Sequence, residues 1–147
     1  MTMVKRFLLV DDDTDDRELF SEALACVNPV IICDLAADAE EALTILDSKE
    51  IDAPDIIFLD INLPLMTGWQ FLANLKKTEA YKDIPVIMYS TSNNRRDKEI
   101  AKDLGALCFI TKPSAFKMLK TTLDVIVTYM DRRLYDLICS AVQDLQN

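Results

Sequence analysis

Histidine is absent from this sequence of 147 residues. Catalytic pairs of serine or cysteine with histidine are therefore excluded, and the chain cannot carry a phosphohistidine. Only 2 glycines and 5 prolines occur, and no segment is of low complexity. Disordered segments are usually rich in polar, glycine or proline residues, so we expect a folded chain.

Long apolar runs are also missing. No segment approaches the roughly 20 apolar residues that span a bilayer. Residues 1–10 lack the charged, apolar and small regions of a signal peptide. The net charge of −9 opposes binding to nucleic-acid phosphates and to anionic lipid. We therefore expect a cytoplasmic protein that binds neither nucleic acid nor membrane.

The 4 cysteines are Cys26, Cys33, Cys108 and Cys139. Their spacing fits no zinc site, and zinc sites usually include histidine. Disulfide frameworks are uncommon in cytosolic chains of this size. We interpret these residues as buried apolar thiols.

Short apolar runs alternate with helical patterns along the chain. The runs lie at 7–10, 30–33, 56–59, 86–89 and 107–110. Apolar residues spaced three and four apart predict a helix that Thr14 or Asp13 caps and that ends at Asn28-Pro29. They also predict helices at 39–46, 69–77 and 95–104, and another after Pro113. Five such units predict an α/β fold with a doubly wound parallel sheet.

Polar residues follow the apolar runs. They are Asp11 and Asp12, Asp60, Ser90, and Lys112. Parallel strands place their carboxyl ends at one edge of the sheet, so we expect these residues to lie together. Three carboxylates in one place repel one another unless a cation binds among them, and oxygen ligands favour Mg²⁺. A carboxylate nucleophile, a metal and a lysine together indicate phosphoryl transfer to aspartate.

At these positions the sequence resembles the receiver domain of two-component response regulators. The matching segments are LLVDDD at 8–13, IIFLDINLPLMTG at 56–68, PVIMYST at 85–91 and FITKP at 109–113. The resemblance covers residues 5–127. It implies a flavodoxin-like fold with strand order 2-1-3-4-5. It also implies a phosphorylation-dependent signalling switch that is not a dedicated enzyme.

The resemblance implies a set of metal ligands. Mg²⁺ would be bound by Asp11, Asp12, Asp60 and the backbone carbonyl of Asn62. The acidic pair could also be assigned one residue later, to Asp12 and Asp13. The assignment to Asp11 and Asp12 is preferred because an apolar strand then directly precedes them.

The resemblance also implies residues that handle the phosphoryl group. Asp60 would accept it, Lys112 would bridge to it, and Ser90 would bind it and move toward it. Phe109 would change rotamer when Ser90 moves. Pro113 would follow Lys112 through a cis peptide bond.

Other polar positions have weaker assignments. Asn62 and Ser92 stand where side chains tune the lifetime of the phosphoryl group in the family the sequence resembles. Both are polar here, so the lifetime stays undecided. Asp13, Asp15 and Asp16 are interpreted as a solvated helix start that complements the helix dipole.

The C-terminal part carries an apolar stripe. We expect a receiver domain at 1–127 and a C-terminal helical extension at 128–147. Apolar residues recur at steps of three or four from Phe116 to Leu145. Either the last helix of the receiver continues, or a further helix packs back on the domain. The first arrangement favours a homodimer through this segment, whereas the second covers the chain's own core.

The expected role is that of a stand-alone receiver. Its phosphodonor would be a histidine kinase or a histidine phosphotransfer protein, and its output would pass through a downstream protein partner. One alternative is a Mg²⁺-dependent phosphohydrolase, but Asn62 replaces the second acid that such enzymes use. Another alternative is a receiver-like interaction domain that works without phosphorylation. The intact set of Asp12, Asp60, Ser90 and Lys112 argues against it.

Overall fold

The computed structural model describes residues 4–146. Residues 1–3 of the expected receiver domain and residue 147 of the expected C-terminal extension lie outside this range. The fold is a 5-stranded parallel sheet with order β2-β1-β3-β4-β5, which confirms the expected topology. The strands are β1 (Arg6–Val10), β2 (Ile32–Ala36), β3 (Ile56–Leu59), β4 (Val86–Ser90) and β5 (Cys108–Thr111). The helices are α1 (Thr14–Val27), α2 (Ala39–Asp47), α3 (Gly68–Lys77), α4 (Arg95–Asp103), α5 (Phe116–Asp131) and α6 (Tyr135–Gln146).

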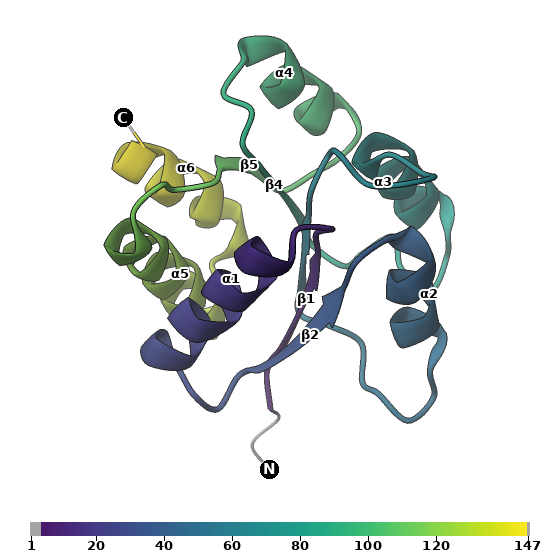
Figure 1. The fold of residues 1–147 in the computed structure, drawn as a ribbon, viewed down its shortest axis with the longest axis horizontal. Helices are drawn as coiled ribbons and strands as arrows, with labels where there is room; N and C mark the ends of the chain where they lie inside the picture. Colours follow the sequence, from purple (N-terminus) through teal and green to yellow (C-terminus); the bar gives the residue numbers. More distant parts are fainter. Residues whose placement is uncertain (1–3, 147) are drawn as a thin grey trace.

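Helices cover both faces of the sheet (Figure 1). The side chains of β1 alternate between the two faces, because successive residues of a strand point in opposite directions. Phe7 and Leu9 pack with residues of α1, α5 and α6, whereas Leu8 and Val10 pack with residues of α2, α3 and α4. Both faces are buried, which explains why the strands read as continuous apolar runs.

The register of the central strands places the acidic residues together. Val10 of β1 lies opposite Leu59 of β3. The Asp60 amide then donates to the Val10 carbonyl at 3.0 Å. Asp11 and Asp60, each the next residue along its strand, therefore leave the same edge of the sheet side by side.

Polar caps fix the helices that border this edge. Asp13 caps α1 by accepting a hydrogen bond from the Asp16 amide. Thr67 caps α3 in a reciprocal capping box with Gln70. Gly105, at φ 91°, follows α4 as the predicted helix stop.

Two local expectations were wrong. The second strand is Ile32–Ala36 rather than 30–33, and Val30 is 67% exposed in the turn before it. This strand lies at the edge of the sheet, where its residues are only partly buried and the apolar run is a weak guide. The described residues contain no cis peptide bond, so the bond between Lys112 and Pro113 is trans rather than cis as expected.

The C-terminal segment forms a separate helix rather than a continuation of α5. The chain turns at Arg133, whose φ is 58°. Helix α6 then packs against α5 and β5. Its residues Ile138 and Val142 are fully buried, and the Gln146 side chain donates to the Thr111 carbonyl at 2.8 Å. The second of the two expected arrangements is therefore the one observed.

The described helices are all too short or too polar to cross a membrane.

At the outer strand β2, Ile32 and Leu35 are each 39% exposed. The two edges of the sheet thus differ, since β5 is the strand that α6 contacts.

Candidate functional site

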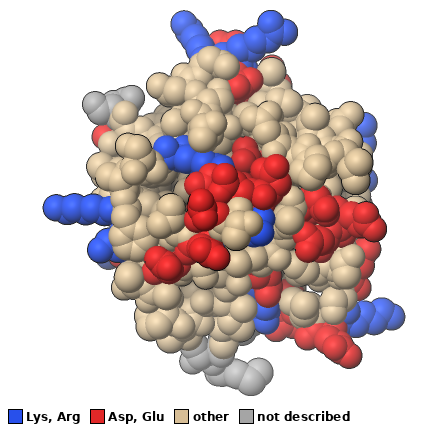
Figure 2. Space-filling view, in the orientation of Figure 1, with Lys and Arg blue, Asp and Glu red and all other residues tan. Residues whose placement is uncertain are grey.

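Three carboxylates meet at the carboxyl ends of β1 and β3. Oxygen atoms of Asp11, Asp12 and Asp60 all lie within 4.8 Å of one another. Asp11 and Asp60 are buried, whereas Asp12 is exposed. Figure 2 shows acidic side chains gathered near the centre of one face of the molecule, with basic side chains among them. The structure therefore brings Asp11, Asp12 and Asp60 together, while Asp13 caps α1, and their role as metal ligands stays a prediction.

Lys112 is the central cation of the site. Its Nζ atom lies 2.7 Å from Asp11, 2.8 Å from Asp16 and 2.9 Å from Asp60. It also stands 5.5 Å from the centre of the Tyr89 ring, a cation–π contact. The lysine thus holds carboxylates from three segments of the chain in one cluster.

The contact with Asp16 was not expected from the sequence. An acid in the first turn of a helix usually complements the dipole, and nothing in the sequence separates Asp16 from Asp15. The cap at Asp13 fixes where α1 starts and so directs Asp16 toward Lys112. Asp15 is exposed, as expected for an acid in a solvated helix start.

Burial shapes the protonation of the cluster. It raises the pKa of Asp11 to about 6, and it outweighs the hydrogen bond from Lys112, which lowers this pKa. Burial alone would lower the pKa of Lys112, but hydrogen bonds with Asp11, Asp16 and Asp60 together raise it. The lysine therefore stays charged at neutral pH, and the acids remain crowded around it.

The donor set fits a hard divalent cation. Asp11 Oδ2 is buried, and the Lys112 ammonium 2.7 Å away is its close polar neighbour. A buried carboxylate oxygen in this state has capacity for a metal ion, and its neighbours are oxygen ligands. Asp12 is exposed and leaves room for water beside them. Asn62 is exposed two residues after Asp60, and its carbonyl as a ligand stays a prediction.

Ser90 ends β4 beside the cluster and is fully buried. Its hydroxyl oxygen accepts a hydrogen bond from the Ser92 amide at 3.3 Å. The Lys112 amide donates to the Ser90 carbonyl at 2.7 Å, so the predicted hydroxyl and lysine are tied together through their backbones. The Ser92 hydroxyl donates to Asp97 at 2.6 Å, toward the first turn of α4. Its influence on a phosphoryl lifetime stays a prediction.

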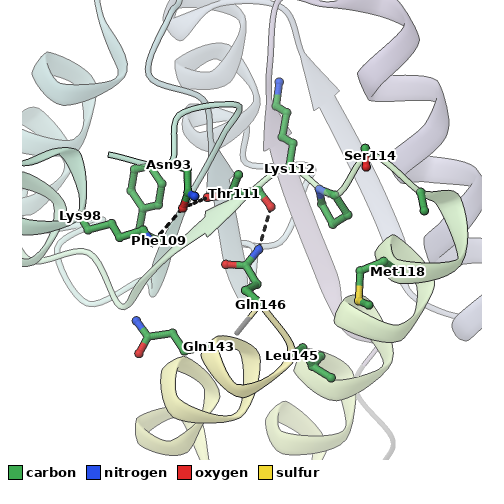
Figure 3. Close-up of a pocket in the computed structure, with 12 residues that line it drawn as sticks. Asn93, Lys98, Phe109, Thr111, Lys112, Ser114, Met118, Gln143, Leu145 and Gln146 are labelled. Carbon is green, nitrogen blue, oxygen red and sulfur yellow. Dashed lines mark hydrogen bonds between the residues drawn. The ribbon is translucent and has the colours of Figure 1, made fainter. Parts of the chain in front are cut away.

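Phe109 is 4% exposed and packs on the α4 side of the sheet. It lies opposite Met88 in the pairing of β4 with β5. Its ring also borders a cavity between β5 and α6 (Figure 3). The predicted change of rotamer stays a prediction.

Gly68 packs directly against the backbone of the acidic loop, which is the segment from Asp60 to Thr67 between β3 and α3. Its amide donates to the Ile61 carbonyl at 2.8 Å. A Cβ atom at this position would lie 2.0 Å from the Asp60 carbonyl oxygen and 2.8 Å from Ile61 Cα. The residue is a glycine because the backbone of the acidic loop passes directly against it, and φ is not positive here.

Comparisons with known proteins point to one family. The family described as response regulator receiver domain matches residues 7–124. A protein-glutamate methylesterase/protein-glutamine glutaminase of Myxococcus xanthus is 37% identical over 107 residues, which are 72% of this chain and 29% of that protein. The two-component response regulator ORR1 of Oryza sativa is 36% identical over 115 residues, which are 75% of this chain and 50% of that protein. The chain thus spans at most half the length of these two relatives.

Solved structures show the same fold. A phosphorylated cyanobacterial phytochrome response regulator, RcpA, has a TM-score of 0.78 and 32% identity, with 86% of this chain and 94% of that chain covered. The chemotaxis response regulator CheY4 of Vibrio cholerae has a TM-score of 0.69 and 30% identity, with 82% and 97% covered. With the sheet order, the acidic cluster and the family match in agreement, the chain belongs to the response regulator receiver domains of two-component systems.

Proposed function

We propose that this chain is a phosphorylation-dependent switch in which Asp60 accepts the phosphoryl group. The observation that carries the proposal is the position of Lys112 between Asp11 and Asp60, at 2.7 Å and 2.9 Å. Both carboxylates are buried, and a buried ion pair adds little net stability because its charges lose their contact with water. A lysine held between these two carboxylates therefore favours a role in phosphoryl transfer over a purely structural one. The donor is a phosphohistidine of a histidine kinase or of a phosphotransfer protein.

Each side chain has a distinct part in the transfer. A carboxylate oxygen of Asp60 attacks the phosphorus, and the bond between phosphorus and the donor nitrogen breaks with its electron pair on the imidazole. Lys112 balances the charge that develops on the phosphoryl oxygens. Ser90 exchanges its contact with the Ser92 amide for a hydrogen bond to one of these oxygens.

Mg²⁺ would be held by Asp11, Asp12 and Asp60, with the Asn62 carbonyl as a further ligand. When bound, the ion supplies positive charge that offsets repulsion between the phosphoryl group and the acids. Phosphorylation adds roughly one to two negative charges at a crowded carboxylate. Ser90 and Lys112 are drawn toward them, which biases the loop after β4 and the face formed by α4, β5 and α5.

The test is the intact mass of the full chain after incubation with acetyl phosphate, with and without Mg²⁺. We expect one phosphoryl adduct that requires both Mg²⁺ and Asp60 and is lost in Asp60→Asn. Asp15→Asn, a change of the same type at an exposed acid near the site, keeps the adduct. If Mg²⁺ binds, seen by calorimetry, but the wild type forms no adduct, the proposed function is wrong.

Lys112 is the proposed link between phosphorylation and output. Lys112→Ala is expected to accept the phosphoryl group more slowly and without the gain in partner binding, because the lysine no longer balances the charge in transfer or draws β5 toward the phosphate. A pull-down with the phosphorylated variant and its partner measures this gain. Full retention of the gain would contradict the role of Lys112.

We also propose how the switch meets its partners and whether it self-associates. A downstream protein partner reads the switch, the chain acts in the cytoplasm, and it is not a dedicated enzyme. The methylesterase activity named for one relative belongs to a protein of which this chain matches 29%. A homodimer through 128–147 would use Leu134 and Leu137, at 38% and 49% exposure, since Ile138 and Val142 are buried in the chain's own core. Sedimentation at tens of micromolar tests it, and a monomer there counts against the dimer.

A further inference from the structure

Two cysteines meet where α6 packs on β5. Cys108 begins β5 and is 4% exposed, and Cys139 is half-buried on α6. The Cys108 thiol donates a weak hydrogen bond to the Phe109 carbonyl at 3.8 Å, and the two cysteines perturb each other's pKa. Both sulfurs belong to free thiols and lie on the same apolar cluster. The expectation of four buried thiols was wrong, since only Cys108 is buried and Cys26 is exposed.

The pair is open to small molecules. Both cysteines line a cavity of about 510 Å³ between α4 and α6. Arg95, Lys98 and Lys102 of α4 line the same cavity, together with a single acid, Glu99. Nearby cations favour a thiolate, and a partly exposed, electropositive surrounding is typical of reactive cysteines.

The two thiols differ in reactivity. Cys139 is half-buried beside the cations of the cavity, whereas Cys108 is buried. The neighbouring Cys108 lowers the pKa of Cys139, although burial opposes this, and the pKa of Cys108 is raised by Cys139 and by burial. Cys139 is therefore the attacking sulfur and Cys108 the resolving one. Cys33 contrasts with Cys139, because burial and Asp34 raise its pKa to about 12.

We propose that Cys108 and Cys139 form a thiol–disulfide site that hydrogen peroxide oxidises, so that a covalent bond ties α6 to β5. The Cys139 thiolate attacks one peroxide oxygen, so an S–O bond forms, the O–O bond breaks, and the released hydroxide takes a proton to become water. The Cys108 sulfur then attacks the Cys139 sulfenic acid, the S–S bond forms, and a second water leaves with the Cys108 proton. The two thiols lose two electrons and two protons, which the peroxide gains.

The cross-link acts on the strand that carries the site lysine. Gln146 already joins the end of α6 to the Thr111 carbonyl, one residue before Lys112 (Figure 3). A second cavity of about 770 Å³ lies between this end of α6 and the loop after β5. The disulfide adds a covalent tether at the start of β5, so α6 becomes fixed at both ends of the strand.

The test treats the reduced full chain with hydrogen peroxide and maps the product by non-reducing peptide mass spectrometry. We expect one Cys108–Cys139 cross-link, an intact mass lower by two hydrogens, and slower amide exchange over residues 135–146. Cross-linking is expected to be faster than oxidation of Cys26, because the cations that line the cavity favour the Cys139 thiolate.

Matched variants separate this site from general oxidation. Cys139→Ser, at a half-buried position, abolishes the cross-link and leaves Cys108 reduced, whereas Cys26→Ser and Cys33→Ser keep it. The cross-link is mapped in the wild-type protein, so the test does not depend on whether a Cys108→Ser variant folds. A wild type that keeps both thiols, scrambles its cross-links, or accumulates sulfinic acid at Cys139 would overturn the proposal.

Discussion

Gly68→Ala tests how closely the acidic loop is packed. The added Cβ would lie 2.0 Å from the Asp60 carbonyl oxygen and 2.9 Å from the Asp60 carbonyl carbon. Both atoms are backbone, so no flexible side chain can move aside. The loop that carries Asp60 must therefore shift, and the amide bond from Gly68 to the Ile61 carbonyl must lengthen.

The loss of stability follows from three contributions. Overpacking against backbone costs about 3 kcal/mol, at the upper end of its usual range. The weakened hydrogen bond adds about 1 kcal/mol. Alanine gains up to about 1 kcal/mol over glycine in a helix, and Gly68 is the first residue of α3. The net loss is about 3 kcal/mol, or a fall in Tm of about 10 °C for a chain of this size.

Urea unfolding gives this free energy, and calorimetry with Mg²⁺ reports on the acidic loop. Gly105→Ala is the matched control, because its φ of 91° disfavours alanine while its Cβ would lie 3.7 Å or more from Lys76. The control is expected to lose about 1–2 kcal/mol and to keep its affinity for Mg²⁺. A Gly68→Ala protein as stable as Gly105→Ala, with unchanged Mg²⁺ affinity, would refute the packing argument.

Two further substitutions test the contacts of α1 and α6. Asp16→Asn is expected to speed phosphorylation by acetyl phosphate up to about fivefold, because a partly exposed ion pair that holds the site lysine is worth about 0.2–1 kcal/mol. The intact-mass time course measures the rate, and an equal change in Asp15→Asn would show that the effect is only one of net charge. Ile138→Ala should lose about 2–5 kcal/mol in urea unfolding, since Ile138 is fully buried. Leu137→Ala, at 49% exposure, should stay within about 0.5 kcal/mol, and similar losses in both would mean that α6 does not dock as described.

The buried strands were predictable because each is a short apolar run directly before a polar residue. In β3 the run 56–59 precedes Asp60, and in β1 the run 7–10 precedes Asp11. The parallel sheet then brings these ends together without further information. The edge strand β2 lacked this signal, and Val30 was assigned to it although it lies in the turn before.

Contacts that depend on the direction of a helix were not predictable. Asp16 reaches Lys112 from the first turn of α1, whose start the Asp13 cap sets, and no single residue type encodes that contact. The break between α5 and α6 falls at Arg133, where φ is positive without a glycine to signal it. The apolar spacing therefore predicted the buried face of the C-terminal segment, but not where the chain turns back.

The contact of α6 with β5 has a consequence for self-association in solution. An outer strand with unpaired amides and carbonyls is a template for strand addition and amyloid-like growth. On β5 the Thr111 carbonyl is taken by Gln146, whereas β2 presents Ile32 and Leu35 at 39% exposure. Aggregation by edge pairing is therefore expected to begin at β2 in the intact chain, and proteolytic removal of α6 would open a second edge to it.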